Sequence, residues 1–348
     1  MLSKVYVEEN QDYDLIVIKA FIKKVIDDIL LTDKLFYDGQ KVFLKLNLLT
    51  DRKPEQVTTT NPVFVQGIIQ VLKKIGCVIS LGDSPAGKMN QERLEHIYEV
   101  TGFKRLAEVE QVELNYDCSS VRINNIFQVK AMHDVDIVVN VCKMKTHVYT
   151  TFTGAVKNCY GSIPGEIKHQ QHALHPTTRS FCDYLIKVAQ TLNPAISFMD
   201  GIMAMQGNGP SNGKAYAARL MLASLNPYAL DHIAIRLLQI PEKLVLTDIL
   251  ARRKKLYDEA ELVSSKSMKE LLRYDFKLAD NTNLAKLMRR IPFPEFDQDI
   301  CIGCQACYNN CPQHTIVMLN NKAVLKPENC IKCYCCQEIC PVNAIKVI

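Results

Sequence analysis

The sequence predicts an α/β protein: an open, mostly parallel sheet with flanking helices, plus a small C-terminal α+β domain rich in cysteine. Three observations support this fold class. Short apolar runs alternate with segments of helical periodicity, polar residues follow several of those runs, and nine of the 14 cysteines lie between Cys301 and Cys340. We expect a large domain over residues 1–290, a stiff two-proline linker at 291–296 and the cysteine-rich domain at 297–348.

Five apolar runs are predicted as strands of the large domain: residues 42–46, 77–81, 137–141, 195–199 and 220–223. Between the first two lies a helical segment, residues 61–75, with its apolar side chains on one face. Asn61 suits the N-cap position, Pro62 the first turn and Gly76 the position after the last turn. This order of strand, helix and strand predicts a βαβ unit and hence a parallel sheet.

Polar side chains gather at the predicted carboxyl ends of these strands. They are Lys45 and Asn47, Asp83 and Ser84, Lys143, Lys145 and His147, and Asp200. Open parallel sheets bind ligands at that edge, so we expect one shared crevice there. An alternative for Asp83 and Ser84 is that they cap a following helix with Pro85 at its first position.

The stretch KMKTHVYTTFTGAVKNCYGSIPG, residues 143–165, contains three lysines and three glycines. In an extended chain, three of its side chains project on the same side: Lys143, Lys145 and His147. Thr153 is then placed to cap a short helix that starts at Gly154, with Lys157 one turn in, and free amides at a helix start favour an anion. We predict that this region binds phosphate or carboxylate. The alternative is a solvated lysine cluster at the rim of the sheet.

Histidine offers further candidate chemistry. His147 is the candidate proton donor of the crevice. On a helix, His169 and His172 would share one face with His175 partly rotated away, so a metal pair is one interpretation and polar surface is the other.

The tail carries one cysteine pattern twice. Cys301-x-x-Cys304-x-x-Cys307-x-x-x-Cys311-Pro recurs 29 residues later as Cys330-x-x-Cys333-x-x-Cys336-x-x-x-Cys340-Pro. Three closely spaced cysteines wrap one cluster, while the fourth, next to a proline, points away from it. The pattern predicts two cross-ligated 4Fe-4S clusters, one held by Cys301, Cys304, Cys307 and Cys340, the other by Cys330, Cys333, Cys336 and Cys311.

Two zinc sites are the alternative, because zinc also takes paired Cys-x-x-Cys. Zinc rarely needs four evenly spaced cysteines followed by proline, and residues 297–348 resemble a two-cluster bacterial ferredoxin. Cys335 is an extra thiol, which we interpret as packing or a reserve ligand. Between the two halves, Asn320 and Asn321 suit a hairpin turn with positive φ. A module of this size is typical of one-electron relay.

Net charge and the distribution of apolar residues argue against a nucleic-acid-binding, membrane-spanning or exported protein. The 348 residues have a formal net charge of +5, and residues 251–290 alone account for that excess. Two bound clusters would move the charge close to zero, so we predict no nucleic-acid binding. The longest apolar runs fall short of a membrane span, and the first fifteen residues lack the apolar region of an export signal. We therefore expect a cytoplasmic protein.

Several long segments resemble, in the same order, the iron-sulfur-centre proteins of the domain of unknown function 362 family. They are FLKLNLL, VTTTNP with LGDSPAG, the stretch at 143–165, MDGIMAMQGNGPSNG and ASLNPYALD, which together span about residues 40–235. Where the family more usually has a proline between the lysine and asparagine of the first segment, this chain has leucine. The resemblance implies an α/β domain fused to a ferredoxin; the family's reaction is not established.

Two functions follow from these patterns. The first is an iron-sulfur oxidoreductase that passes electrons between its two 4Fe-4S clusters and an anionic small molecule or cofactor in the α/β domain. The ligand would be held by Lys45, Asn47, Asp83, Ser84, Lys143, Lys145, Thr153, Gly154 and Lys157, with a redox partner protein supplying or accepting electrons. The alternative is a non-catalytic electron carrier or assembly module that docks a partner enzyme through residues 251–290.

Overall fold

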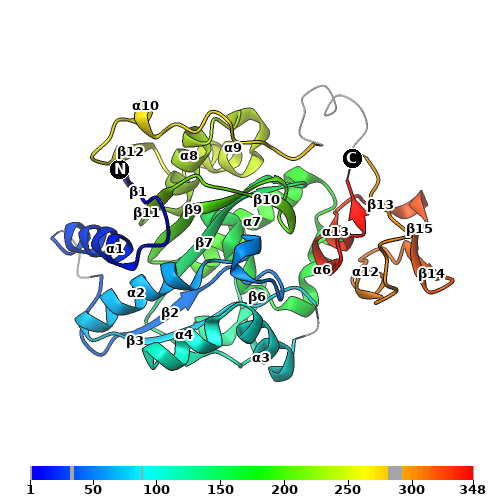
Figure 1. The fold of residues 1–348 in the computed structure, drawn as a ribbon, viewed down its shortest axis with the longest axis horizontal. Helices are drawn as coiled ribbons and strands as arrows, with labels where there is room; N and C mark the ends of the chain where they lie inside the picture. Colours follow the sequence, from blue (N-terminus) through cyan, green and yellow to red (C-terminus); the bar gives the residue numbers. More distant parts are fainter. Residues whose placement is uncertain (1, 32–34, 88, 281–291, 348) are drawn as a thin grey trace.

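A computed structural model describes residues 2–31, 35–87, 89–280 and 292–347. Its centre is a ten-stranded sheet (Figure 1). The strands are β1 (Leu2–Glu9), β2 (Lys41–Lys45), β3 (Val78–Gly82), β4 (Glu113–Leu114), β7 (Ile137–His147), β8 (Thr151–Thr153), β9 (Ile196–Asn208), β10 (Asn212–Tyr216), β11 (Leu220–Ser224) and β12 (Glu259–Val263). The order is β12-β1-β11-β9-β7-β2-β3-β4, with β8 paired to β7 and β10 to β9.

The central strands of the sheet are parallel. β2 pairs in parallel with β3 and β7, β7 with β9, and β3 with β4, whereas β11 runs antiparallel between β9 and β1. The predicted open, mostly parallel sheet is therefore confirmed. β7 and β9 are longer than predicted and extend beyond the carboxyl ends of β2 and β3, so Lys145 and His147 lie past those ends, where β7 pairs with β8.

Helices cover both faces of the sheet. One face packs against α1 (Leu15–Leu30), α2 (Pro62–Ile75), α3 (Gln91–Val100) and α4 (Phe103–Glu110), and the other against α5 (Ala155–Asn158), α7 (Thr178–Leu192), α8 (Pro227–Leu237) and α9 (Leu246–Arg253). Side chains of one strand alternate between the two cores: Val139 and Val141 belong to the first, Val138 and Cys142 to the second. Burial of these apolar rows on both sides holds the layers together.

The first predicted helix has the predicted termini. Asn61 accepts a hydrogen bond from the amide of Val63, Pro62 is the first helical residue, and Gly76 ends α2 with φ +97°. A left-handed conformation of this kind favours glycine. Smaller elements complete the domain: the hairpin β5 (Ser120–Ile123) and β6 (Ile126–Val129), α6 (Lys168–Leu174), α10 (Met268–Leu271), and 3-10 turns at 54–56, 130–132, 159–162, 165–167 and 242–244.

The C-terminal module shows its internal duplication in the backbone. α12 (Ala306–Asn309) and α13 (Cys335–Ile339) occupy equivalent positions, β13 (Glu295–Phe296) pairs with β16 (Ile345–Lys346), and β14 (Ile316–Leu319) with β15 (Lys322–Leu325). Positive φ recurs at positions 29 residues apart: Gly303 and Lys332, Gln305 and Tyr334, His314 and Asn343. Asn320 and Asn321 form the predicted turn, with φ of 49° and 60°.

The module lies against the α/β domain next to α6 and the tip of the β9–β10 hairpin (Figure 1). Arg52 donates hydrogen bonds to the Cys340 carbonyl at 3.2 Å and to Asn343 Oδ1 at 2.8 Å. The Ser211 hydroxyl donates to the Glu338 carbonyl. The predicted boundary near residue 290 stays a prediction, and Ile291, part of the predicted linker, lies outside the described residues.

Candidate functional site

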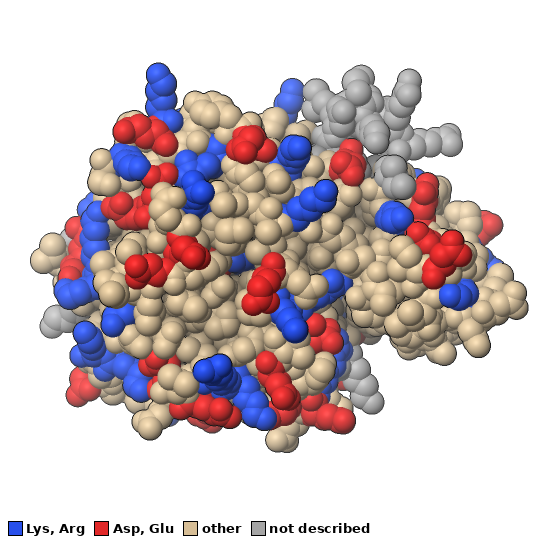
Figure 2. Space-filling view, in the orientation of Figure 1, with Lys and Arg blue, Asp and Glu red and all other residues tan. Residues whose placement is uncertain are grey.

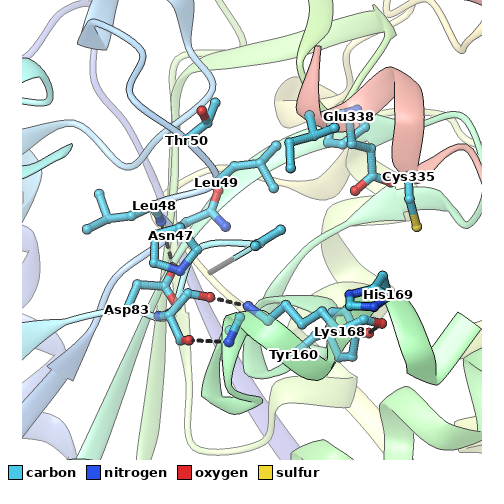
Figure 3. A pocket seen from close by; sticks show the side chains of 18 of the residues that line it. Asn47, Leu48, Leu49, Thr50, Asp83, Tyr160, Lys168, His169, Cys335 and Glu338 are labelled. Atoms are coloured by element: carbon cyan, nitrogen blue, oxygen red, sulfur yellow. Dashed lines mark hydrogen bonds between the residues drawn. The ribbon is translucent and has the colours of Figure 1, made fainter. Parts of the chain in front are cut away.

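A pocket lies where the carboxyl ends of β2, β3 and β7 meet the C-terminal module (Figure 3). Its walls include Asn47, Asp83, Lys145 and Lys157 from the α/β domain, and Cys335, Glu338 and Ile339 from α13. We call this space the basic pocket. Its volume of about 90 Å³ is several times the roughly 10–15 Å³ that one water occupies by the same measure, so it has room for a small molecule.

Asp83 forms the floor of the basic pocket; its buried ion-pair partner, Lys45, is not among the lining residues, which corrects the predicted contact of Lys45 with a ligand. Lys45 Nζ donates to Asp83 Oδ1 at 2.8 Å, and both side chains are at most 4% exposed. The amides of Leu48 and Ser84 also donate to the Asp83 carboxylate. Asp83 and Ser84 do not cap a helix, since α3 begins later and is capped by Asn90, so that alternative is wrong. The pair compensates its own charge and fixes the shape of the floor.

Three lysines line the walls beyond this pair. Lys145 Nζ donates to the Thr58 carbonyl at 2.7 Å, and Lys168 Nζ donates to the Ser84 carbonyl. Lys157 lies over the ring of Tyr160, 5.7 Å from its centroid. Burial, helped by the nearby Lys157 charge, lowers the pKa of Lys145 to about 7, and burial lowers the pKa of Lys168 to about 7. The pKa of Lys157 is also lowered by burial.

Burial is the largest cause of each lowered pKa. The carboxylates that act against it are Glu338 for all three lysines and Asp83 for Lys145 and Lys168, and Asp83 is already paired with Lys45. An anion in the pocket would raise the pKa of all three. The arrangement is therefore chemically suited to a small anion.

Lys143 does not belong to the basic pocket. It pairs across β7 and β9 with Asp200, its Nζ 2.7 Å from Oδ2, and also donates to the Tyr13 hydroxyl. The β7–β9 pairing shifts register between Lys143 and Lys145, and only Lys145 lines the pocket. Lys143 thus neutralises a buried carboxylate, and its predicted role in holding a ligand is corrected.

The start of α5 is already occupied by an anion of the protein itself. The amides of Ala155 and Val156 donate to the carboxylate of Asp231 at 2.6 and 3.0 Å. Gly154 is the N-cap, and the Thr153 side chain forms no capping hydrogen bond, so the predicted cap is wrong. The amides after Gly154 are not free for a ligand, although Thr153 still lines the pocket.

His147 lies behind the pocket wall. Its Nδ1 accepts hydrogen bonds from the amides of Tyr149 and Thr150, which leaves the proton on Nε2, 3.1 Å from Glu338 Oε1. Burial and Lys157 lower the pKa of His147 to about 4. Burial alone would raise the pKa of Glu338, but His147 and Lys157 lower it to about 2. His147 is placed to hold Glu338, not to protonate a ligand, which corrects its predicted role.

Several polar atoms that face the basic pocket have no hydrogen-bond partner among the described residues. They are Asn47 Oδ1, Thr153 Oγ1, His169 Nδ1, His172 Nδ1 and Glu338 Oε1. Buried polar atoms without partners are rare in folded proteins and call for water or a ligand. Their concentration at one pocket is independent support for a binding site.

A metal pair is one of the two interpretations of the histidines at 169–175; in the structure His172 joins a candidate ligand group with Cys333 and Cys335 instead. Within the described ranges, His169 and His172 do not join one candidate ligand group. His172 is buried and stacks on Phe181 with ring centroids 4.1 Å apart, and His175 stacks on Tyr184. α6 uses these rings for packing, with His169 facing the pocket.

The eight predicted cluster ligands line two cavities in the predicted groups. One is bordered by Cys301, Cys304, Cys307 and Cys340, which we call the outer set; the other by Cys311, Cys330, Cys333 and Cys336, the inner set. The amides of Thr315 and Ala344 donate to the sulfurs of Cys311 and Cys340 at 3.3 and 3.2 Å. Amide donors to thiolates stabilise bound clusters, so these residues fit the group that the spacing implies.

Comparison with known proteins adds to this geometry. Residues 42–236, more than half of the chain, match the family described as "domain of unknown function (DUF362)". Residues 293–341 match the 4Fe-4S dicluster domain family. The chain belongs to the DUF362 family. Its tail is accordingly a 4Fe-4S ferredoxin-type domain, as the cysteine spacing predicted, and the zinc alternative is disfavoured.

A curated relative of this DUF362 protein is the thylakoid-associated protein sll1697 of Synechocystis sp. It is 29% identical over 247 residues, which cover 69% of this chain and 76% of that protein. The structure of the lactate racemase apoprotein from Thermoanaerobacterium thermosaccharolyticum aligns with a TM-score of 0.38 and 12% identity, over 65% of this chain and 54% of that chain. A likeness of that size says nothing about the reaction.

None of the helices that the structure describes has the length and apolarity needed to cross a bilayer. The cytoplasmic location stays a prediction. Sequence reasoning missed Lys168 and Glu338 at the site of this DUF362 protein. Lys168 follows the glycine-rich stretch that carries Lys157 and could have been included with it; Glu338 gave no signal, because its role depends on how the module docks.

Proposed function

We propose that this protein is an iron-sulfur oxidoreductase that exchanges electrons with a small anionic molecule or cofactor bound in the basic pocket. The single observation that carries the proposal is the composition of the pocket wall: lysines of the α/β domain on one side and residues of the 4Fe-4S module on the other. Figure 3 shows Cys335 and Glu338 of α13 across the pocket from Asp83 and Lys168. A ligand here is held next to the part of the chain that carries electrons.

The chain's own residues supply binding and charge control. Lys145, Lys157 and Lys168 attract the anion, while the Lys45–Asp83 pair keeps the floor fixed and neutral. Because the pKa values of Lys145 and Lys168 are near 7, each gains protonation when an anion arrives. Bound 4Fe-4S clusters would supply one-electron transfer, which the protein side chains cannot perform.

A lysine double variant tests the binding site. Lys145→Gln combined with Lys157→Gln removes two cations from the wall, and Lys74→Gln, an exposed lysine on α2, is the matched control. We expect the double variant to lose sulfate and oxalate binding by calorimetry while its visible cluster spectrum stays unchanged, and the control to bind as the natural protein does. Unchanged affinity for both anions in the double variant would refute the site.

The electron-carrier alternative places partner docking on residues 251–290. Much of the positive charge in the described part of this segment is compensated: Arg252 contacts Glu242 and Asp248, and Lys266 and Arg273 contact Glu9. Figure 2 shows both signs of charge interspersed on the viewed face. We favour the pocket for this reason. Anaerobic purification that yields a stoichiometric partner protein and no bound small molecule would favour the alternative.

A further inference from the structure

The two cysteine sets differ in their relation to the basic pocket. Cys335, which follows the expected ligand Cys333 by two positions, lines both the basic pocket and the cavity of the inner set. The cavity of the outer set shares none of its lining residues with the pocket. Exposure does not separate the two sets, since each contains buried cysteines and one of intermediate exposure; only Cys304 of the outer set is exposed.

A histidine of the α/β domain reaches this boundary. A ring nitrogen of His172 and the sulfurs of Cys333 and Cys335 all lie within 4.8 Å of one another. The ring is fixed by stacking on Phe181 and by edge contacts with Tyr149 and Tyr160, and its Nδ1 has no hydrogen-bond partner among the described residues. A buried imidazole N–H needs an acceptor, and the sulfur of Cys333, within 4.8 Å of a ring nitrogen of His172, is the candidate acceptor.

Cys335 is the second neighbour of the Cys333 sulfur, besides His172. Its sulfur lies within 4.8 Å of the Cys333 sulfur, and it is not one of the four cysteines that the spacing assigns to the inner set. The S–H group of this extra thiol can therefore act as a hydrogen-bond donor to the sulfur of Cys333, a role distinct from packing and from ligation. His172 and Cys335 together approach one sulfur of the inner set.

We propose that His172 and Cys335 are positioning residues that donate hydrogen bonds to the Cys333 sulfur, and that the inner set is the one in contact with the pocket ligand. Donors to a cluster sulfur stabilise the more negative, reduced state and so raise the reduction potential. The inner cluster would then have a higher potential than it has without these donors. The assignment to a pocket ligand rests on the proposed function; the hydrogen bonds do not.

The test measures the two reduction potentials separately, by anaerobic redox titration of the iron-loaded protein followed by electron paramagnetic resonance. His172→Phe keeps the stacking ring and removes the N–H; His172→Gln restores a donor. His175→Phe, at the end of the same helix, is the control. We expect His172→Phe to lower one potential so that the reduced-to-oxidised ratio at fixed potential changes about tenfold, equal to about 59 mV for a one-electron couple. The second potential and the iron content should not change.

Three results would overturn the proposal. They are equal shifts of both potentials, no shift in either, and loss of iron in His172→Phe, which would make the histidine a ligand instead of a donor. If His172→Phe does not fold, Cys335→Ala carries the same test, because it should lower the same single potential. Addition of sulfate should perturb only the signal that His172→Phe shifts; absence of that effect, with the potential shift intact, would remove the pocket assignment and leave the hydrogen bonds.

Discussion

The C-terminal module and the α/β domain encode their sites in different ways. In the module, the ligands stand at fixed offsets within one short segment, and the cysteines group in the structure as the spacing predicted. In the α/β domain, the site residues come from several strands and loops. The role of each lysine depends on which residue, distant in the sequence, it contacts in the folded protein. The difference teaches that spacing predicts which cysteines group together, whereas charge alone does not identify a binding residue.

The largest expected effect concerns the inner set. Cys336→Ala removes an expected ligand, and Cys335→Ala removes its neighbour, which is not one. We expect Cys336→Ala to lose about half of the bound iron, because one of two clusters loses a ligand, and Cys335→Ala to keep it. Iron and acid-labile sulfide analysis after anaerobic purification measures both. Equal iron loss in the two variants would mean that spacing has not identified the ligand.

A second prediction concerns the floor of the pocket. Lys45→Met leaves the carboxylate of Asp83 buried without its ion-pair partner, which costs about 3–5 kcal/mol. The midpoint of urea unfolding, followed by circular dichroism, should fall accordingly. Lys23→Met removes one partner of the exposed Lys23–Asp27 pair and should cost less than about 1 kcal/mol. Similar losses in both variants would contradict a structural role for the buried pair.

A third prediction concerns the junction of the two regions. Arg52 is 8% exposed and donates to the Cys340 carbonyl and to Asn343. Arg52→Ala should weaken docking by about 1.5–3 kcal/mol, the value of hydrogen bonds from a charged donor. Hydrogen exchange over residues 334–347 should accelerate, while exchange in α2 should stay the same. Unchanged protection of that segment would show that the junction is held by other contacts.

The smallest effect is a pH dependence of anion binding. Lys145 and Lys168 have pKa values of about 7 in the ligand-free pocket, and a bound anion raises them, so binding takes up protons. Affinity for sulfate should change little below pH 6 and fall above pH 7, by up to about tenfold per pH unit for each proton taken up. Calorimetry from pH 6 to pH 8.5 measures this. Lys145→Arg, which stays charged, should flatten the profile; an identical slope would contradict the assignment.

Particular residues show how far sequence reasoning extends. Asn61, Pro62 and Gly76 delimit α2 as predicted because capping depends on local backbone chemistry. Lys145 lies in the predicted crevice because parallel strands end at a common edge.

The corrections share a physical reason. Lys143 forms an ion pair with Asp200 on another strand, so it does not share the role of Lys145. The first amide after Gly154 donates a hydrogen bond to Asp231, a residue distant in the sequence. Glu338 enters the pocket through docking of the module. Each depends on a long-range contact, and a single sequence contains no signal of such contacts.

The central claim is that lysines of the α/β domain hold an anion beside the iron-sulfur module. Mass spectrometry of the small molecules released from anaerobically purified, iron-loaded protein tests it most directly. We predict one anionic species in the natural protein that is absent from the Lys145→Gln, Lys157→Gln double variant at equal iron content. A natural protein that carries no anion, or a double variant that carries the same amount, would contradict the account.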